Sequence, residues 1–308
     1  MAILYTKAMR ITIGDIKKEY LGKIDALDLD LILADVLKKP REFVLAHPEY
    51  ELPPLKIVNC KLKIARRMRT EPLAYILGSK EFFGLPFLVS PATLIPRPET
   101  ELMVEEALEE VKSHRSSIIR IIDVGTGSGN IIISIAKKIH HTWTPDVHKG
   151  HRVSFCAIDI SKAALTVARR NAKKNNVTEK IKFLHGNLLE PILKRQKFEI
   201  CNLKFVILAN LPYLSEKIYT ATLPTVKKFE PKSALYSPKK GLGHYEKLFR
   251  QINLLKKDYP SSRLICYAEI SPEQKTPMQS LVRNFFPLAG VNFKKDLAGK
   301  WRLAIITL

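Results

Sequence analysis

Short apolar runs alternate with helical stretches from about residue 100 onward, and this alternation is the feature that most constrains the fold. The runs are SIIRIIDVG, RVSFCAID, IKFLHGN, FVILAN and RLICYAEI, and each is apolar nearly throughout. Strands of that kind, separated by helices, are typical of a parallel sheet covered on both faces. VNFKKDL and KWRLAIITL, separated by Ala298-Gly299, predict an antiparallel pair at the sheet edge. We therefore predict an α/β protein with a doubly wound, mostly parallel sheet.

The residues before this region have a helical pattern instead. In DALDLDLILADVLKKP, the apolar residues Leu27, Leu31, Ala34 and Leu37 fall on one helical face, and the helix is expected to stop at Pro40. EFFGLPFLVSPATLIPRPETE then places five prolines and glycines between apolar stretches, which predicts a β-hairpin and a linker. The predicted parts are a helical domain at 1–78, a hairpin and linker at 79–99, and the α/β domain at 100–308.

The segment IIDVGTGSGN, residues 121–130, predicts a strand, a glycine turn and a helix in succession. Glycine tolerates positive φ and has no Cβ, so the backbone of such a turn can approach a ligand closely. A dinucleotide-binding G-x-G-x-x-G turn needs glycine at 130, where this chain has Asn130. The compact spacing of Gly125, Gly127 and Gly129 after Asp123 favours S-adenosylmethionine, which has no pyrophosphate.

Four successive strands carry glycine or polar residues at their carboxyl ends, where open α/β sheets bind ligands. Asp159 is placed to bind ribose hydroxyls, and it is equally suited to cap the helix that starts at Ser161. Asn187 and a backbone N–H near Leu188 are placed to bind adenine. The predicted donor-binding residues are Gly125, Thr126, Gly127, Ser128, Gly129, Asp159, Asn187, Leu188 and Asn210.

The fourth strand is followed by Asn210-Leu211-Pro212-Tyr213. ANLPY resembles the (N/D)-P-P-(Y/F) motif of methyltransferases that modify planar amide or amine nitrogens. With PLAYILG and IPRPETE, DVGTGSGN, GNLLEP, FEPKSALYSPKKGLGHYEKL and KKDLAGKWRLAI, it makes the whole chain resemble the peptide chain release factor N5-glutamine methyltransferase family (HemK/PrmC type). The resemblance implies a class I, Rossmann-like methyltransferase fold that uses S-adenosylmethionine, with a small N-terminal helical domain that docks the substrate.

The resemblance also implies the reaction, which is methylation of the side-chain nitrogen N5 of the glutamine in the GGQ loop of release factors. Asn210, Leu211, Pro212 and Tyr213 are then the predicted catalytic residues. The Asn210 side-chain oxygen and the carbonyl of residue 211 would accept the two amide N–H bonds, with no metal required. Tyr213 would pack flat against the amide plane.

The tetrapeptide leaves other functions open. Adenine presents a similar planar amino group, so an N-methyltransferase acting on an exocyclic amino group in RNA or DNA is the main alternative. A catalytically silent adaptor that binds RNA or ribosomes and a dinucleotide-dependent oxidoreductase are further alternatives.

The chain departs from the family at two positions, which are Leu211, where proline is usual, and Asn187, where aspartate is usual. Leucine keeps its carbonyl and Pro212 still favours extended backbone at residue 211, so we expect activity to persist. The resemblance further implies that Arg97, Glu99, Thr100 and Glu101 shape the pocket rim. Glu269, in AEISPEQ, also matches the family, without an evident role.

Charge, cysteine content and histidine content bear on partners and compartment. Fifty-one Lys and Arg against thirty Asp and Glu give a net charge of +21, which fits either RNA or ribosome proximity or a merely solvated surface. Membrane-length apolar runs, a signal peptide and CxxC pairs are all missing, so we expect a cytoplasmic protein with reduced thiols at Cys60, Cys156, Cys201 and Cys266. His140, His141, His148 and His151 match no known zinc spacing and predict a solvated insertion.

Overall fold

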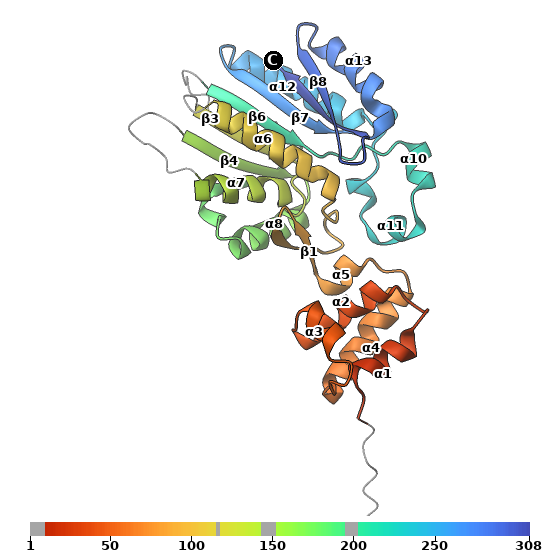
Figure 1. The fold of residues 1–308 in the computed structure, drawn as a ribbon. Coiled ribbons are helices and arrows are strands. Elements are labelled where there is room, and N and C mark those ends of the chain that lie inside the picture. Colours follow the sequence, from red (N-terminus) through yellow and green to blue (C-terminus); the bar gives the residue numbers. More distant parts are fainter. Residues whose placement is uncertain (1–9, 115–117, 143–151, 195–202) are drawn as a thin grey trace, which may run out of the picture. The chain divides into compact units, whose positions relative to one another are not determined.

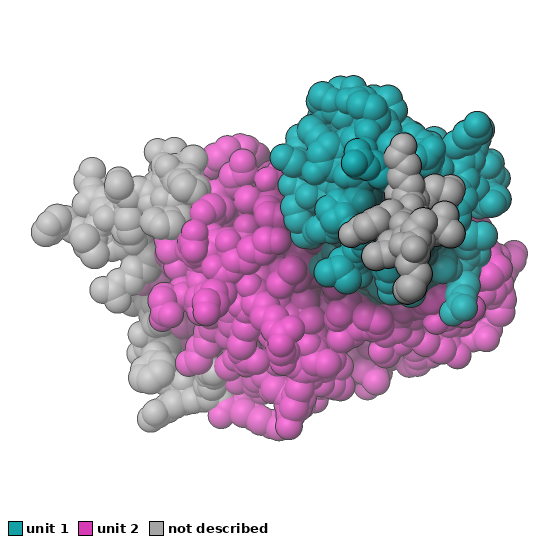
Figure 2. Space-filling view, turned by 90° about the horizontal axis from the view of Figure 1, so that it is seen from below, with its two compact units in different colours: residues 1–78 teal, residues 79–308 magenta. Residues whose placement is uncertain are grey.

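The structure is a computed structural model, and it describes residues 10–114, 118–142, 152–194 and 203–308. The chain divides into two compact units, residues 1–78 and 79–308, which are coloured separately in Figure 2. Each unit has its own hydrophobic core. Within the described ranges, no helix has both the length and the apolar character that a membrane span needs.

The first unit is a set of helices around one core (Figure 1). They are α1 (Ile13–Tyr20), α2 (Ala26–Leu37), α3 (Arg41–Ala46), α4 (Pro54–Met68) and α5 (Leu73–Leu77). Two polar side chains start the first two helices: Thr12 forms a capping box with Asp15, and Asp25 accepts the first free N–H groups of α2.

The face of α2 that is buried differs from the predicted one. Leu29, Ile32, Leu33 and Val36 are buried with the predicted Ala34, whereas Leu27 is 47% exposed. Helices α3 and α4 both pack against α2. The buried arc is therefore set by two neighbouring helices, and a helix with apolar residues at nine of its twelve positions offers more than one suitable arc.

The second unit begins with a hairpin. Strands β1 (Ser79–Phe82) and β2 (Leu85–Leu88) pair antiparallel, and both turn residues, Phe83 and Gly84, have positive φ. Asn171 ties this hairpin to helix α8 (Lys162–Lys174), because its side-chain amide accepts from the N–H of Leu88 and donates to the Leu88 carbonyl.

A seven-stranded sheet forms the centre of the second unit, in the order β5-β4-β3-β6-β7-β9-β8 (Figure 1). Five strands are parallel, and the last two, β8 and β9, run antiparallel as predicted. Strand β9 inserts between β7 and β8, so β8 is at the edge. The strands are β3 (Ile118–Val124), β4 (Arg152–Asp159), β5 (Ile181–His185), β6 (Leu203–Ala209), β7 (Arg263–Glu269), β8 (Gly290–Lys295) and β9 (Trp301–Thr307). The predicted fold class is confirmed.

Helices cover both faces of the sheet. One core cluster contains side chains of α6 (Glu101–Ser113) and α7 (Asn130–Thr142), and the other contains side chains of α12 (Gly243–Asp258) and α13 (Lys275–Phe285). Cys60, Cys156 and Cys266 are buried in these cores, and Cys201 lies outside the described residues.

Several short elements complete the second unit. They are the helices α9 (Glu190–Leu193), α10 (Glu216–Ala221) and α11 (Pro224–Phe229), and the 3₁₀ turns η1 (Pro98–Thr100), η3 (Thr178–Lys180), η4 (Lys232–Ala234) and η5 (Pro272–Gln274). Helices α10 and α11 project away from the sheet in Figure 1. A bridge between Leu214 and Tyr236 closes the base of this excursion.

The sheet order reverses at β3. From this strand the chain continues through β4 and β5 on one side and through β6 and β7 on the other. Such a switch point leaves a crevice at the carboxyl ends of the strands, and ligands bind there in open α/β sheets. The glycine turn follows β3 directly and therefore lies at this crevice.

Candidate active site

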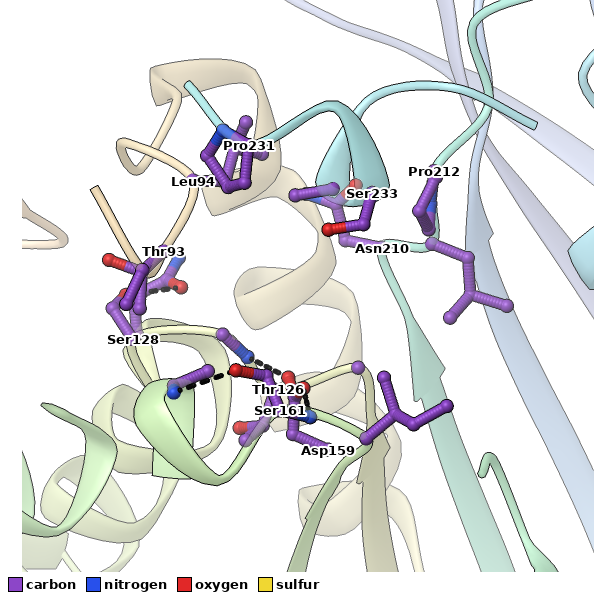
Figure 3. A pocket seen from close by; sticks show the side chains of 18 of the residues that line it. Thr93, Leu94, Thr126, Ser128, Asp159, Ser161, Asn210, Pro212, Pro231 and Ser233 are labelled. Atoms are coloured by element: carbon purple, nitrogen blue, oxygen red, sulfur yellow. Dashed lines mark hydrogen bonds between the residues drawn. The ribbon is translucent and has the colours of Figure 1, made fainter. Parts of the chain in front are cut away.

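A pocket of about 310 Å³ lies at the carboxyl ends of β3, β4, β5 and β6. Lining residues stand at the end of each strand or directly after it, where the sequence pattern predicts them. Figure 3 shows Asn210 and Pro212 on one side of this pocket and Thr126, Asp159 and Ser161 on another. Of the predicted residues, the pocket is lined by Gly125, Thr126, Gly127, Ser128, Asp159, Asn187, Leu188, Asn210, Leu211 and Pro212.

The glycine turn needs glycine at all three predicted positions. Gly125, Gly127 and Gly129 have φ of 70°, 55° and 79°, in the left-handed region that other residues rarely adopt. Gly129 does not line the pocket, and its role is steric, since a Cβ there would lie 2.7 Å from Ile133 Cδ1. At Gly125 a Cβ would lie 3.1 Å from Leu211 Cδ2, so the open space at this position depends on the tetrapeptide.

The buried carboxylate of Asp123, near the end of β3, is hydrogen-bonded to the glycine turn. The Thr126 hydroxyl donates to Asp123 Oδ2 at 2.6 Å, and Asp123 Oδ1 is buried without a hydrogen-bond partner among the described residues. Burial raises the pKa of Asp123 to about 7, against the effect of the Thr126 hydrogen bond, which lowers it.

Asp159 combines contacts to the turn with exposure to the pocket. Its Oδ2 accepts from the N–H of Gly127 at 2.9 Å, and its Oδ1 accepts from the N–H of Ser161 at 2.8 Å. The side chain of Ser161, rather than Asp159, caps α8, by accepting from the N–H of Ala164. Burial raises the pKa of Asp159, and these backbone hydrogen bonds act in the opposite direction. The carboxylate is thus held rigidly at the pocket wall.

The loop after β5 is fixed by α12. Gln251 accepts from the N–H of Leu189 at 2.6 Å, and Leu188 adopts a left-handed conformation with φ of 54°. Asn187 donates its side-chain N–H to Glu190 Oε1 at 3.2 Å. The loop therefore presents its two pocket-lining residues, Asn187 and Leu188, in a defined conformation.

The residues of the tetrapeptide differ in their exposure to the pocket. Asn210 lines the pocket and donates from Nδ2 to Thr100 Oγ1 at 3.2 Å. Leu211 is only 3% exposed and packs in the core beside the turn. Tyr213 is not among the residues that line the pocket, and its hydroxyl donates to Glu269 Oε1 at 3.1 Å.

The predicted rim residues also divide into two groups. Arg97 and Thr100 line the pocket, whereas Glu101 accepts from the N–H of Phe83, and Glu99 is not in the lining. Arg97 Nη2 lies 2.5 Å from Oε1 of Glu230, whose side chain is 1% exposed. This ion pair connects the segment before α6 to the segment after α11, which supplies Pro231 and Ser233 to the pocket (Figure 3).

Sequence reasoning missed this partner of Arg97 and the role of Glu269. Glu230 and Glu269 each stand within blocks shared with the family, FEP and AEI, which is the one signal that was available. The predicted solvated insertion with its four histidines stays a prediction, because residues 143–151 and the side chains of His140 and His141 lie outside the described residues. In the described remainder, no group of three or more His, Cys, Asp or Glu side chains is arranged to hold a metal.

Two family models match this chain. The model of the PrmC N-terminal domain matches residues 19–78, and a methyltransferase domain model matches residues 115–263. A release factor glutamine methyltransferase of Enterococcus faecalis is 35% identical over 262 residues, which cover 85% of this chain and 84% of that protein. The chain belongs to the release factor glutamine methyltransferase family. The resemblance predicted from the sequence is thereby confirmed.

Two further comparisons bear on the family and on the fold, respectively. A release factor glutamine methyltransferase of Clostridium botulinum is 33% identical over 291 residues, covering 94% of each chain. The crystal structure of the hMettl16 catalytic domain in complex with MAT2A 3′UTR hairpin 6 has a TM-score of 0.51, at 15% identity, over 82% of this chain and 81% of that chain. At that identity the likeness shows a shared methyltransferase fold alone.

Proposed function

We propose that this chain transfers a methyl group from S-adenosylmethionine to N5 of the glutamine in the GGQ motif of peptide chain release factors, and so tunes translation termination. Family membership supports the proposal, since the relatives are named for that reaction. The observation that carries it is the position of Asn210, whose amide lines the same pocket as the glycine turn and is held there by Thr100.

The residues at the strand ends fit the donor. Three glycines with positive φ leave positions 125, 127 and 129 of the turn without a Cβ atom, and the Asp159 carboxylate is suited to ribose hydroxyls. Asn187 and Leu188 are suited to the adenine end. S-adenosylmethionine supplies an electrophilic methyl carbon on a sulfonium sulfur.

Positioning is the main task of the protein, because the lone pair of a carboxamide nitrogen is delocalised and weakly nucleophilic. The Asn210 Oδ1 and the Leu211 carbonyl would accept the two N–H bonds and aim the nitrogen lone pair at the methyl carbon. The nitrogen gains a bond to carbon, the carbon–sulfur bonding pair stays with sulfur, and the nitrogen loses one proton to water. Orientation of this kind supplies up to about 7–11 kcal/mol in favourable cases.

The test is methyl transfer to a defined glutamine. The full-length chain is incubated with methyl-labelled donor and purified release factor, with a release factor whose GGQ glutamine is replaced by alanine, with RNA and with duplex DNA. Mass spectrometry should place the label on that glutamine alone. Label on a base amino group, with none on the glutamine, would refute the proposal and favour the nucleic-acid alternative.

Asn210 is a candidate for both substrate and donor binding, and one variant separates these roles. Asn210→Ala should abolish methyl transfer while calorimetry shows nearly unchanged donor affinity, because the lost acceptor serves the substrate amide. A large loss of donor affinity would assign the residue to the donor instead.

We also propose that the first unit docks the release factor, that the protein is cytoplasmic, and that its basic surface lies near ribosomal or other RNA. Exposed cations on α8 support the last point, since none forms an ion pair within the described residues: Lys162, Arg169, Arg170, Lys173 and Lys174. RNA binding should weaken steeply with salt, and Lys173→Glu with Lys174→Glu should flatten that dependence. Binding that is insensitive to salt would contradict this surface.

A further inference from the structure

A chain of hydrogen bonds connects the substrate-facing amide to a buried carboxylate. Asn210 Nδ2 donates to Thr100 Oγ1 at 3.2 Å, and the Thr100 hydroxyl donates to Glu269 Oε2 at 2.7 Å. The other carboxylate oxygen, Oε1, accepts from the Tyr213 hydroxyl at 3.1 Å. Thr100 and Glu269 are both almost fully buried, so water does not compete for the hydrogen bond between them.

The carboxylate at the end of this series of hydrogen bonds fixes which group donates in each of them. An ionised carboxylate only accepts hydrogen bonds, so the single hydroxyl proton of Thr100 must point to Glu269. The Thr100 oxygen is then an acceptor toward Asn210, and the Asn210 atom that faces it must be the NH₂ group. Oδ1 is left as the amide atom for the substrate, and none of the described residues donates to it.

Three neighbouring groups favour the ionised carboxylate that this polarity requires, and they act against burial, which is the largest influence on the pKa of Glu269. Burial raises the pKa of Glu269, whereas the Thr100 hydroxyl, the nearby Arg302 guanidinium and the Tyr213 hydroxyl lower it, in that order. Burial and the Glu269 charge raise the pKa of Tyr213, so its hydroxyl remains protonated and donates. The main chain of Glu269 is fixed as well, because its carbonyl accepts from the buried Tyr245 hydroxyl.

We infer that Thr100 and Glu269 are positioning residues that orient the Asn210 amide with its oxygen toward the substrate. The inference rests on the proposed function, and it assigns roles to two residues that do not themselves touch the reacting atoms. With the opposite orientation, the Asn210 NH₂ group would meet the N–H bonds of the substrate amide. Two donors would then oppose each other, and the acceptor needed for the glutamine would be lost.

The test compares two variants at Thr100. Thr100→Val keeps the shape but removes the hydroxyl, so Asn210 loses the acceptor that selects its NH₂ group. Thr100→Ser keeps the hydroxyl and should restore turnover close to wild type. We expect Thr100→Val to lower kcat on the release factor on the order of 10²-fold, the size of effect that misplacement of reacting groups produces. Donor affinity, measured by calorimetry, should remain near wild type in both variants.

Glu269→Gln tests the other end of the chain of bonds. Its amide can face Thr100 with either atom, so we expect a smaller loss of kcat than in Thr100→Val. Because Glu269 acts through Thr100, the double variant should be no slower than Thr100→Val alone. Urea unfolding of every variant shows that it is folded under the assay conditions.

The outcomes are distinguishable. Wild-type turnover in Thr100→Val, an equal loss in Thr100→Ser, or losses that multiply in the double variant would each overturn the positioning role. If the wild-type chain leaves the release factor unlabelled, the proposed function fails, and this role for Asn210 fails with it.

Discussion

Two glycines of the donor-binding turn should differ sharply in their tolerance of alanine. Gly127 and Gly129 both have positive φ, so alanine carries a backbone cost at each. Their surroundings differ. A Cβ at Gly127 would meet only the Gly125 carbonyl oxygen, at 4.0 Å, whereas a Cβ at Gly129 would lie 2.7 Å from Ile133 Cδ1 and 3.2 Å from Ala168 Cβ.

The expected magnitudes follow from these distances. Left-handed backbone costs an L-residue roughly 1–2 kcal/mol, and this applies to both variants. Gly129→Ala adds the cost of overpacking, typically about 1–3 kcal/mol. The Ile133 methyl can rotate away, but Ala168 has no such freedom, and α8 itself must shift. We therefore expect Gly129→Ala to lower the free energy of unfolding by about 1–3 kcal/mol more than Gly127→Ala.

Urea unfolding followed by tryptophan fluorescence measures this difference. Both tryptophans of the chain, Trp143 and Trp301, belong to the second unit, so the signal reports that unit and not residues 1–78. The reduced entropy of the unfolded chain is the same for both glycine-to-alanine changes and cancels in the comparison. Equal losses, or a larger loss for Gly127→Ala, would refute the steric account of Gly129.

Four further substitutions test the surroundings of the site by urea unfolding, and one of them, Leu211→Pro, is tested by kcat as well. Burial raises the pKa of Asp123 to about 7, so the folded chain retains a proton that the unfolded chain loses above about pH 4, and stability falls as the pH rises from 4 to 7. Between pH 5 and 8 the free energy of unfolding of Asp123→Asn should fall by about 1–3 kcal/mol less than that of the wild type. An equal fall in both proteins would contradict the raised pKa of Asp123. Arg97→Met should destabilise the protein more than Glu230→Gln does, because the loss of Arg97 leaves the buried Glu230 carboxylate without its cation. The reverse order would show that the ion pair contributes little. Leu211→Pro should lower the free energy of unfolding by about 2 kcal/mol, because a buried leucine side chain is lost. Its kcat should stay at or above that of the wild type, because the main-chain carbonyl at residue 211 remains. A large drop in kcat would show that the leucine itself is required.

The parallel strands β3 to β7 were predictable because each is a short, almost wholly apolar run between helical patterns. The face of α2 was not, since spacing allows both the arc with Leu27 and the arc with Leu29, and only packing against α3 and α4 selects one. Local patterns specify an element well when a single burial arrangement fits them. They fail when neighbours distant in sequence decide between two.

The same distinction applies to the site. The pocket residues at strand ends were predictable because parallel strands bring their carboxyl ends to one edge. The hydrogen bonds behind them were not, because Thr100 is 110 residues from Asn210 and 169 residues from Glu269. The placement of the Tyr213 ring outside the pocket lining likewise follows from Glu269, whose function no local pattern indicates.

Strand β9 is late in the sequence but interior in the sheet, and this affects how the chain tolerates shortening. It pairs along β7, with Leu303 opposite Glu269, and the Arg302 carbonyl accepts from the N–H of Ile270 just beyond. A chain cut before Trp301 would leave β7, which is buried along nearly its whole length, as an open apolar edge. Such an edge pairs with strands of other molecules, so the shortened protein would self-associate. Glu269, at the end of β7, would also lose the pairing with β9 that holds its main chain.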